Sequence, residues 1–230
     1  MDPTTTIHED GRRSDPILHY FYDPLCGWCY ASEPLIEIAR QIADLRIELH
    51  GGGLIPEPVR LPEAKRKQVR VADARIHDLT GQVFGPAYLD DLLDHPDAIW
   101  HSPPTIAAVM AAEAIAKDKA FPMIAAIQRA HYVHGRRVVD PDTLAELAQS
   151  IGLDESAFRK RYASAFVAEH IEDSRGMMRR FGLHGFPTFL LEISGQFVRL
   201  QHEPLYGKPD EFKKLVTLFM TELGLTRSVS

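Results

Sequence analysis

The chain has 230 residues, of which 45% are hydrophobic and 25% are charged, and its formal net charge is −6. This composition is typical of a water-soluble globular protein that can bury a substantial core, either as one large domain or as a domain with an insertion. No global basic field would attract nucleic acid or anionic lipid, and no apolar run approaches the ~18 residues of a membrane span, so neither is a predicted partner.

Residues 1–15 are polar and acidic, and we predict that they form a disordered tail. This stretch has no apolar segment of the kind that a secretory signal requires. We therefore expect the protein to be cytoplasmic.

The first structured segment is predicted to be a β-α-β unit. Residues 17–22 form a short aromatic run that indicates a buried strand, and residues 27–43 carry apolar side chains at helical spacing. Residues 45–50 alternate like a second strand, so the unit implies parallel strands and a right-handed crossover. The three glycines at 51–53 mark a strand end that another backbone or a substrate approaches closely. His19, inside the first strand, is interpreted as a core or edge histidine whose hydrogen bonds are satisfied.

Residues 62–167 are predicted to form an inserted helical domain. The segment has apolar positions at helical spacing and no strand-like run of any length, and we expect four to six helices. Gly152 is a candidate C-terminal cap of one helix, and Asp154 is a candidate N-terminal cap of the next.

The pattern changes again after the helical block. Residues 168–182 read as a helix, and two apolar runs at 188–193 and 196–201 are separated by Ser194-Gly195, a hairpin signal. Residues 209–223 form an amphipathic closing helix.

The chain order is therefore β-α-β, helical block, α-β-β-α. We expect the flanking parts, residues 16–61 and 168–224, to fold together, because a two-stranded unit alone is marginally stable. We predict an α/β fold class in which these parts form one domain and residues 62–167 are inserted into it.

The chain has two cysteines, Cys26 and Cys29, with Gly27 and Trp28 between them. Cys26 follows the first predicted strand and begins a helix, where unpaired N–H groups and the positive end of the helix dipole favour a thiolate. Cys29 lies one turn later, so the two sulfur atoms share a face and can bond. In this interpretation Cys26 is exposed and attacks a substrate disulfide, and the more buried Cys29 resolves the mixed disulfide.

A zinc site and a chance spacing are the alternatives for this pair. Structural zinc needs four ligands, and the chain has no second cysteine pair. His131 and His134 could complete a two-cysteine, two-histidine set, but they lie far along the chain on a predicted helix. The strand before the cysteines and the helix after them favour a redox pair, so we predict no metal site.

A second feature is the run Gly185-Phe186-Pro187-Thr188, directly before a predicted strand. Most X–Pro bonds in folded proteins are trans. A proline that opens a strand, after a helix and opposite a redox pair, is a different case, and we predict a cis bond at Pro187. Its ring would pack near the sulfur atoms, and the backbone of Phe186 would pair with an extended substrate strand.

The order strand, Cys-x-x-Cys helix, strand, then helix, proline, hairpin and helix resembles the thioredoxin fold. The helical block before the proline-bearing half resembles the DsbA-like branch of that fold. The phrases HYFYDPLCGWCY, HGGGL, RIHDLTGQVFG and GFPTFLL are similar to those of bacterial DsbA-family proteins described as predicted protein-disulfide isomerases, relatives of the cytoplasmic FrnE type. The resemblance covers residues 16–223 and implies a thioredoxin fold with a large helical insertion.

The resemblance also implies roles for individual residues. Cys26 matches the attacking cysteine, Cys29 the resolving cysteine and Pro187 the cis-proline. Gly27 and Trp28 occupy the variable dipeptide that tunes the reduction potential.

Two positions depart from the family pattern. The strongly oxidising members carry Pro-His in the dipeptide, and Trp28 supplies neither a positive charge nor the hydrogen bonds of a histidine, so we expect a less oxidising disulfide. Members often have a buried acid six residues before the first cysteine, where this chain has Tyr20. Asp23 is the nearest acid and a candidate proton relay to Cys29, although a turn or helix-capping role beside Pro24 is favoured.

These features predict a cytoplasmic thiol–disulfide oxidoreductase, of the disulfide isomerase or reductase kind, that acts on protein disulfides through its Cys-Gly-Trp-Cys dithiol. It needs no prosthetic cofactor, and glutathione is a candidate co-substrate. The expected partners are protein or peptide thiols and disulfides, with a low-molecular-weight thiol or a dithiol protein as electron partner. In a reducing cytosol the pair rests mainly as a dithiol, which favours reduction or isomerisation over net oxidation. We expect a monomer, or a homodimer formed through the helical block.

Two other functions stay open on the sequence. Relatives with the same insertion bind glutathione and perform transferase or isomerase chemistry on small molecules. They typically lack the second cysteine or have serine at the first, whereas this chain retains both. A redox-sensing, chaperone-like protein would instead bind unfolded chains and use its thiols only to report oxidation.

Overall fold

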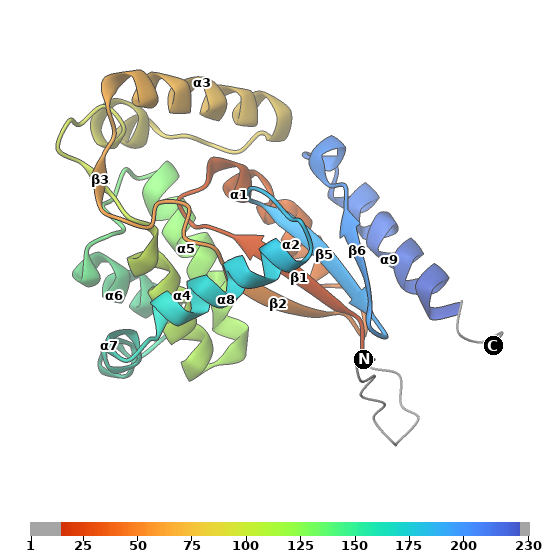
Figure 1. Ribbon diagram of the computed structural model, residues 1–230. Coiled ribbons are helices and arrows are strands. Elements are labelled where there is room, and N and C mark those ends of the chain that lie inside the picture. Colours follow the sequence, from red (N-terminus) through yellow and green to blue (C-terminus); the bar gives the residue numbers. More distant parts are fainter. Residues whose placement is uncertain (1–14, 226–230) are drawn as a thin grey trace.

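The fold is built on one four-stranded sheet, seen in a computed structural model that describes residues 15–225 (Figure 1). The strands lie in the order β2-β1-β5-β6, with β1 at Ile17–Tyr22, β2 at Arg46–Gly51, β5 at Thr188–Ile193 and β6 at Gln196–Leu200. The sheet therefore combines strands from before and after the helical block. The tail predicted for residues 1–15 lies outside the described residues, apart from Asp15.

Strand pairing follows the predicted topology. β1 and β2 are parallel, with His19 opposite Glu48, and β5 runs antiparallel to both β1 and β6. The predicted hairpin turn is present, because Ser194 and Gly195 have φ values of 51° and 78°. Positive φ at both central residues is what a two-residue hairpin turn of this kind requires.

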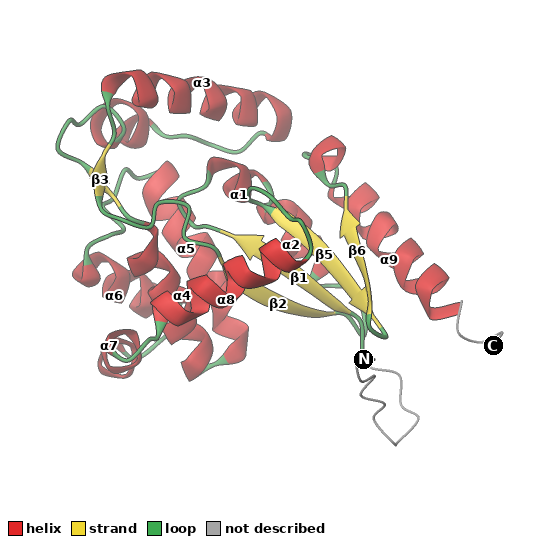
Figure 2. Ribbon diagram, viewed as in Figure 1, coloured by secondary structure: helices red, strands yellow, loops and turns green. Residues whose placement is uncertain are grey.

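Alternate residues of the central strands face two helical layers. Leu18 and Phe189 lie in the core on the side of helix α9 (Pro209–Leu225). On the opposite face Phe21 packs with Met178 of helix α8 (Val167–Arg180), which crosses the near side of the sheet in Figure 2. Each fully buried side chain of this size stabilises the fold by about 1.5–3 kcal/mol.

The single helix predicted for residues 27–43 is wrong, because the chain forms two shorter helices. Helix α1 covers Gly27–Ala31 and helix α2 covers Glu33–Ala39. Pro34 has no N–H to donate to the carbonyl of Tyr30, so the helical ladder is interrupted there. That carbonyl instead accepts a hydrogen bond from Nε2 of Gln82, at 2.9 Å.

The predicted helical block is present between β2 and β5. Its helices are α3 (Glu63–Thr80), a π-helical segment (Ala87–Leu92), α4 (Ser102–Ile115), a short 3-10 helix (Lys117–Lys119), α5 (Ala120–Tyr132), α6 (Pro141–Ser150) and α7 (Glu155–Ala163), and a further 3-10 helix (Glu203–Leu205) precedes α9. The expected absence of strands is wrong at β4 (Ile99–Trp100), which pairs with β3 (Val59–Arg60). Two residues are too few to give a strand periodicity.

Both predicted helix ends near α6 and α7 are confirmed. Gly152 follows the C-cap of α6 with a φ of 84°, a conformation that glycine adopts readily. Asp154 caps α7, because its Oδ1 accepts the N–H of Ala157 at 2.8 Å.

The helical block and the sheet share one hydrophobic core. Tyr22 and Phe189 of the sheet belong to the same buried cluster as Ala108 of α4 and Ile127 of α5. The division at residues 61/62 and 167/168 therefore stays a prediction from the sequence. Among the described residues, no helix is long and apolar enough to cross a membrane.

Candidate active site

The two cysteines lie where the first strand passes into the first helix. β1 ends at Tyr22, Cys26 is the N-cap of α1, and Cys29 lies one turn later. Both are free thiols, and 6% of Cys26 is exposed against 1% of Cys29. The expectation that Cys26 is exposed is therefore wrong, although it remains the more accessible thiol.

The loop before β5 covers Cys26. The Phe186–Pro187 peptide bond is cis, and the carbonyl of Phe186 accepts a hydrogen bond from Cys26 Sγ at 3.4 Å. Gly52 makes room for this loop, because a Cβ there would lie 1.9 Å from Cζ of Phe186. A backbone or a substrate was predicted to approach the three glycines closely, but the groups that approach them are side chains, and at Gly52 that side chain is the Phe186 ring.

Arg175 of α8 contacts both the glycine segment after β2 and the Phe186 ring. Its Nε and Nη2 donate hydrogen bonds to the carbonyls of Gly52 and Gly53, at 2.6 and 3.0 Å. Its guanidinium carbon lies 4.9 Å from the centre of the Phe186 ring. The Phe186 ring next to the dithiol therefore packs between Gly52, which follows β2, and the guanidinium of Arg175 on α8.

The environment of Cys29 disfavours its thiolate. Burial raises the pKa of Cys29 well above its ordinary value, and the hydrogen bond with the Cys26 thiol and the nearby Cys26 charge raise it further. Its sulfur accepts the backbone N–H of Asp23 at 3.4 Å. Cys29 is therefore suited to stay protonated beside Cys26 until a mixed disulfide forms.

Asp23 is fully buried in the turn that leads to Cys26. Its Oδ1 accepts the N–H of Leu25 at 2.9 Å, and its Oδ2 accepts the N–H of Leu54 at 2.6 Å. Burial raises the pKa of Asp23, and these two hydrogen bonds oppose that effect. The carboxyl group ties the turn before Cys26 to the segment after β2.

A groove of about 330 Å³ lies beside the dithiol. Trp28, Phe186 and Pro187 form part of its wall, together with Arg75 of α3 and Arg199 of β6. The guanidinium carbon of Arg75 lies 5.7 Å from the Trp28 ring centre. The Cys-x-x-Cys dipeptide supplies no positive charge, but the helical block and the hairpin bring two arginines to the same groove.

Asp73 of α3 lies directly behind the dipeptide. A Cβ on Gly27 would lie 3.0 Å from Oδ1 of Asp73, and Tyr88 donates a hydrogen bond to its Oδ2 at 2.8 Å. Burial raises the pKa of Asp73 to about 6. A buried carboxyl group whose pKa is raised and which lies beside a redox pair is a candidate functional residue.

Replacing Asp73 with asparagine is expected to change how stability depends on pH. The pKa of Asp73 is raised from 3.8 to about 6, so between these values the folded chain binds more protons than the unfolded chain, and stability falls as pH rises. The loss is about 2–3 kcal/mol above pH 6. Urea unfolding should therefore find Asp73→Asn more stable than wild type by about that amount at pH 7.5, and little changed at pH 4.

Asp78→Asn is the matched control, because Asp78 is exposed on the same helix. It should leave the profile unchanged. Equal destabilisation of Asp73→Asn at both pH values would mean that only the hydrogen bond from Tyr88 matters.

Sequence reasoning did not assign roles to Asp73, Arg175 or Gln82. The signal for Asp73 was present, because it lies three residues before Ile76 on the buried stripe of an otherwise polar helix. The zinc arrangement considered from the sequence does not form: within residues 15–225, no group of three potential metal ligands includes either cysteine.

Comparison with known proteins places this site in a family. A family model described as a DSBA-like thioredoxin domain matches residues 17–201. Among curated proteins no significant match was found.

Solved structures give the same result. The cytosolic disulfide reductase DsbM from Pseudomonas aeruginosa is 42% identical, with a TM-score of 0.80 and coverage of 91% of this chain and 99% of that one. A second structure of DsbM, with GSH, is 40% identical, with a TM-score of 0.79 and coverage of 91% and 100%. A "putative protein disulfide isomerase" from Nitrosomonas europaea is 27% identical, with a TM-score of 0.78 and coverage of 90% and 98%. The chain belongs to the DSBA-like thioredoxin-domain family and is a thiol–disulfide oxidoreductase.

Proposed function

We propose that the protein is a cytoplasmic disulfide reductase that reduces protein or peptide disulfides. Glutathione then reduces its Cys26–Cys29 disulfide back to the dithiol. The observation that carries the proposal is the buried dithiol, in which Cys26 Sγ donates a hydrogen bond to the carbonyl of Phe186. This contact lies at the edge of a groove whose lining includes two arginines. That the similar DsbM is described as a cytosolic disulfide reductase, and has a structure with GSH, supports this direction.

The proposed reaction uses the two thiols in turn. The Cys26 thiolate attacks a substrate disulfide, forms a mixed disulfide and releases the first substrate thiolate, which takes up a proton. Cys29 then loses its proton and attacks Cys26, so that the second substrate thiol leaves and the Cys26–Cys29 disulfide forms. Two glutathione molecules restore the dithiol and leave as glutathione disulfide, which balances the two electrons transferred.

Other residues act through position in this proposal. The carbonyl of Phe186 and the ring of Pro187 line the approach to Cys26, where an extended peptide could pair with the backbone. Gly27 keeps α1 close to α3, and Trp28 forms a groove wall. Both carboxylate oxygens of Asp23 already accept backbone hydrogen bonds, so Asp23 stabilises the turn rather than relaying protons.

The groove suits glutathione by charge. Glutathione carries two carboxylates and one ammonium group, and the lining includes Arg75, Arg199 and Glu203. Arg199 is partly neutralised by its ion pair with Glu203, whose N···O distance is 2.9 Å. Arg75 is therefore the better candidate to bind a glutathione carboxylate.

Arg75→Ala is expected to raise KM for glutathione about two- to fivefold with little change in kcat, because an exposed ion pair contributes about 0.4–1 kcal/mol. Steady-state rates of insulin reduction at varied glutathione, coupled to glutathione reductase and NADPH, measure both constants. Arg161→Ala on the exposed surface of α7 is the matched control and should leave both unchanged. An Arg75→Ala enzyme with unchanged KM would remove Arg75 from the glutathione site.

The same coupled assay tests the proposed function. Wild-type protein should reduce insulin disulfides and consume NADPH in proportion to glutathione disulfide formed. Glutathione-dependent isomerisation of an aromatic substrate without disulfide reduction would overturn the proposal, as would disulfide formation in reduced substrates under the same conditions.

A further inference from the structure

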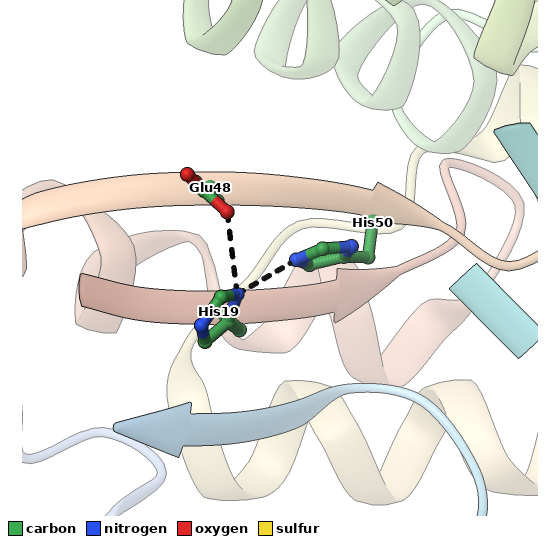
Figure 3. A group of neighbouring side chains, drawn as sticks. All are labelled: His19, Glu48 and His50. Carbon is green, nitrogen blue, oxygen red and sulfur yellow. Dashed lines mark hydrogen bonds and ion pairs between the residues drawn. The ribbon is translucent and has the colours of Figure 1, made fainter. Parts of the chain in front are cut away.

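A separate group of polar side chains lies across β1 and β2, on the sheet face that α8 covers. The parallel register sets His19 opposite Glu48 and Phe21 opposite His50, so all of these side chains point to one face. Figure 3 shows His50 and Glu48 turned toward His19 from the neighbouring strand. Within residues 15–225, this is the one group of three side chains close enough to hold a metal ion together.

The ligand atoms are near the spacing that a metal requires. Nδ1 of His19 lies 2.9 Å from Nε2 of His50 and 3.5 Å from Oε2 of Glu48, and all three atoms are within 4.8 Å of one another. Tetrahedral zinc with bonds of about 2.0–2.1 Å needs ligand atoms about 3.3 Å apart. The Glu48 side chain is partly exposed, so it can move to bring its carboxylate oxygen to ligand distance from the two histidine nitrogens.

The surroundings of His19 match those of a metal-bound histidine. Its Nε2 lies 3.0 Å from Oε2 of Glu192 on β5, a contact that places the proton on Nε2 and leaves the Nδ1 lone pair facing His50 and Glu48. The His50 ring stacks on Phe21 with centroids 4.5 Å apart, which fixes its orientation. His19 has partners on both ring nitrogens, as expected from the sequence.

We propose that His19, His50 and Glu48 bind a zinc ion, with Glu192 orienting His19 and solvent as the fourth ligand. The ion replaces the proton that the two histidines share, and His50 then carries its proton on Nδ1. The negative charges of Glu48 and Glu192 favour the cation, whereas Arg46 opposes it through an ion pair with Oε1 of Glu48, at 3.0 Å. Oε2 of Glu48 stays free to face His19.

Access to this site comes from the Glu48 side. His19 is 4% exposed, whereas the side chains of Glu48 and Glu192 are 39% and 28% exposed. The ion would link β1 to β2 on the strand that leads to Cys26. This site is independent of the proposed reductase function and differs from the cysteine-based zinc site considered from the sequence.

The test must keep zinc away from the thiols, because a free dithiol is itself a zinc ligand. Titration calorimetry of zinc chloride into the full chain carrying Cys26→Ser and Cys29→Ser should find one ion per chain. Cobalt added to the same protein should give the visible absorption of a tetrahedral site. At a zinc concentration of 100 times Kd, Tm should rise by about 5–10 °C.

Four further substitutions in this thiol-free chain, one of them a control, test the site. His50→Gln should weaken zinc binding at least about 100-fold, and Glu192→Gln about 10-fold. His134→Gln, on an exposed histidine after α5, is the matched control and should change nothing. Glu48→Gln alters a partly exposed side chain, so its loss of binding with unchanged circular dichroism would exclude misfolding as the cause. Absence of stoichiometric binding, or binding that survives both His50→Gln and Glu48→Gln, would overturn the proposal.

Discussion

Replacing Cys26 with serine is expected to lower the rate of disulfide reduction by about a thousandfold or more. A hydroxyl cannot form the mixed disulfide, and Cys29 cannot take over because burial raises its pKa well above its ordinary value. Glutathione-coupled insulin reduction gives the rate, and near-UV circular dichroism shows whether the fold is kept.

The isosteric change keeps the shape of the site, so the fold should survive. Ser32→Ala is a control at a second buried residue of the same helical segment, where the hydroxyl of Ser32 contacts Tyr20 at 3.0 Å. It should lose some stability and keep its turnover. If Cys26→Ser retained a tenth of wild-type turnover, Cys26 would not be the nucleophile.

Replacing Cys29 with serine is expected to make the enzyme accumulate as a mixed disulfide between Cys26 and its substrate. Cys26 still attacks, but no second thiol releases the product, so the mixed disulfide accumulates. In a single round started from reduced protein without glutathione, release of the second substrate thiol should fall at least about tenfold relative to wild type. Non-reducing electrophoresis of the variant with oxidised insulin, and then with a cell extract, should reveal adducts that dithiothreitol removes.

The double variant Cys26→Ser/Cys29→Ser is the control and should form no adducts. Glutathione must be omitted at first, because it can resolve the mixed disulfide from outside. Its later addition should release the adduct. If Cys29→Ser formed adducts only with glutathione and none with any protein or peptide, the proposed substrate class would be wrong.

The order of elements and the redox pair could be predicted from local sequence. The aromatic run before Cys26, the hairpin signal at Ser194 and the proline that opens β5 each carry their information within a few residues. Short-range patterns of this kind survive folding because the backbone itself requires them. The broken helix at Pro34 was also visible in the sequence, but apolar spacing outweighed the proline in the prediction.

The surroundings of the dithiol could not be predicted in the same way. Asp73 of α3 lies against Gly27, and Gln82, which follows α3, donates a hydrogen bond to the backbone carbonyl of Tyr30 in α1. No periodicity records which residues of two distant helices touch. The 6% exposure of Cys26 likewise depends on the loop at Phe186, which returns to the site 160 residues later.

The reduction potential of the Cys26–Cys29 couple is the most direct test of the proposed direction. It can be measured by equilibrating the protein with defined ratios of glutathione and glutathione disulfide, and by following the tryptophan fluorescence of a Trp100→Phe variant, in which Trp28 between the cysteines is the single tryptophan. A cytosolic reductase that glutathione recharges should have a potential at or below about −220 mV, near the cytosolic glutathione poise. A potential near −120 mV, typical of a strong disulfide donor, would contradict the account.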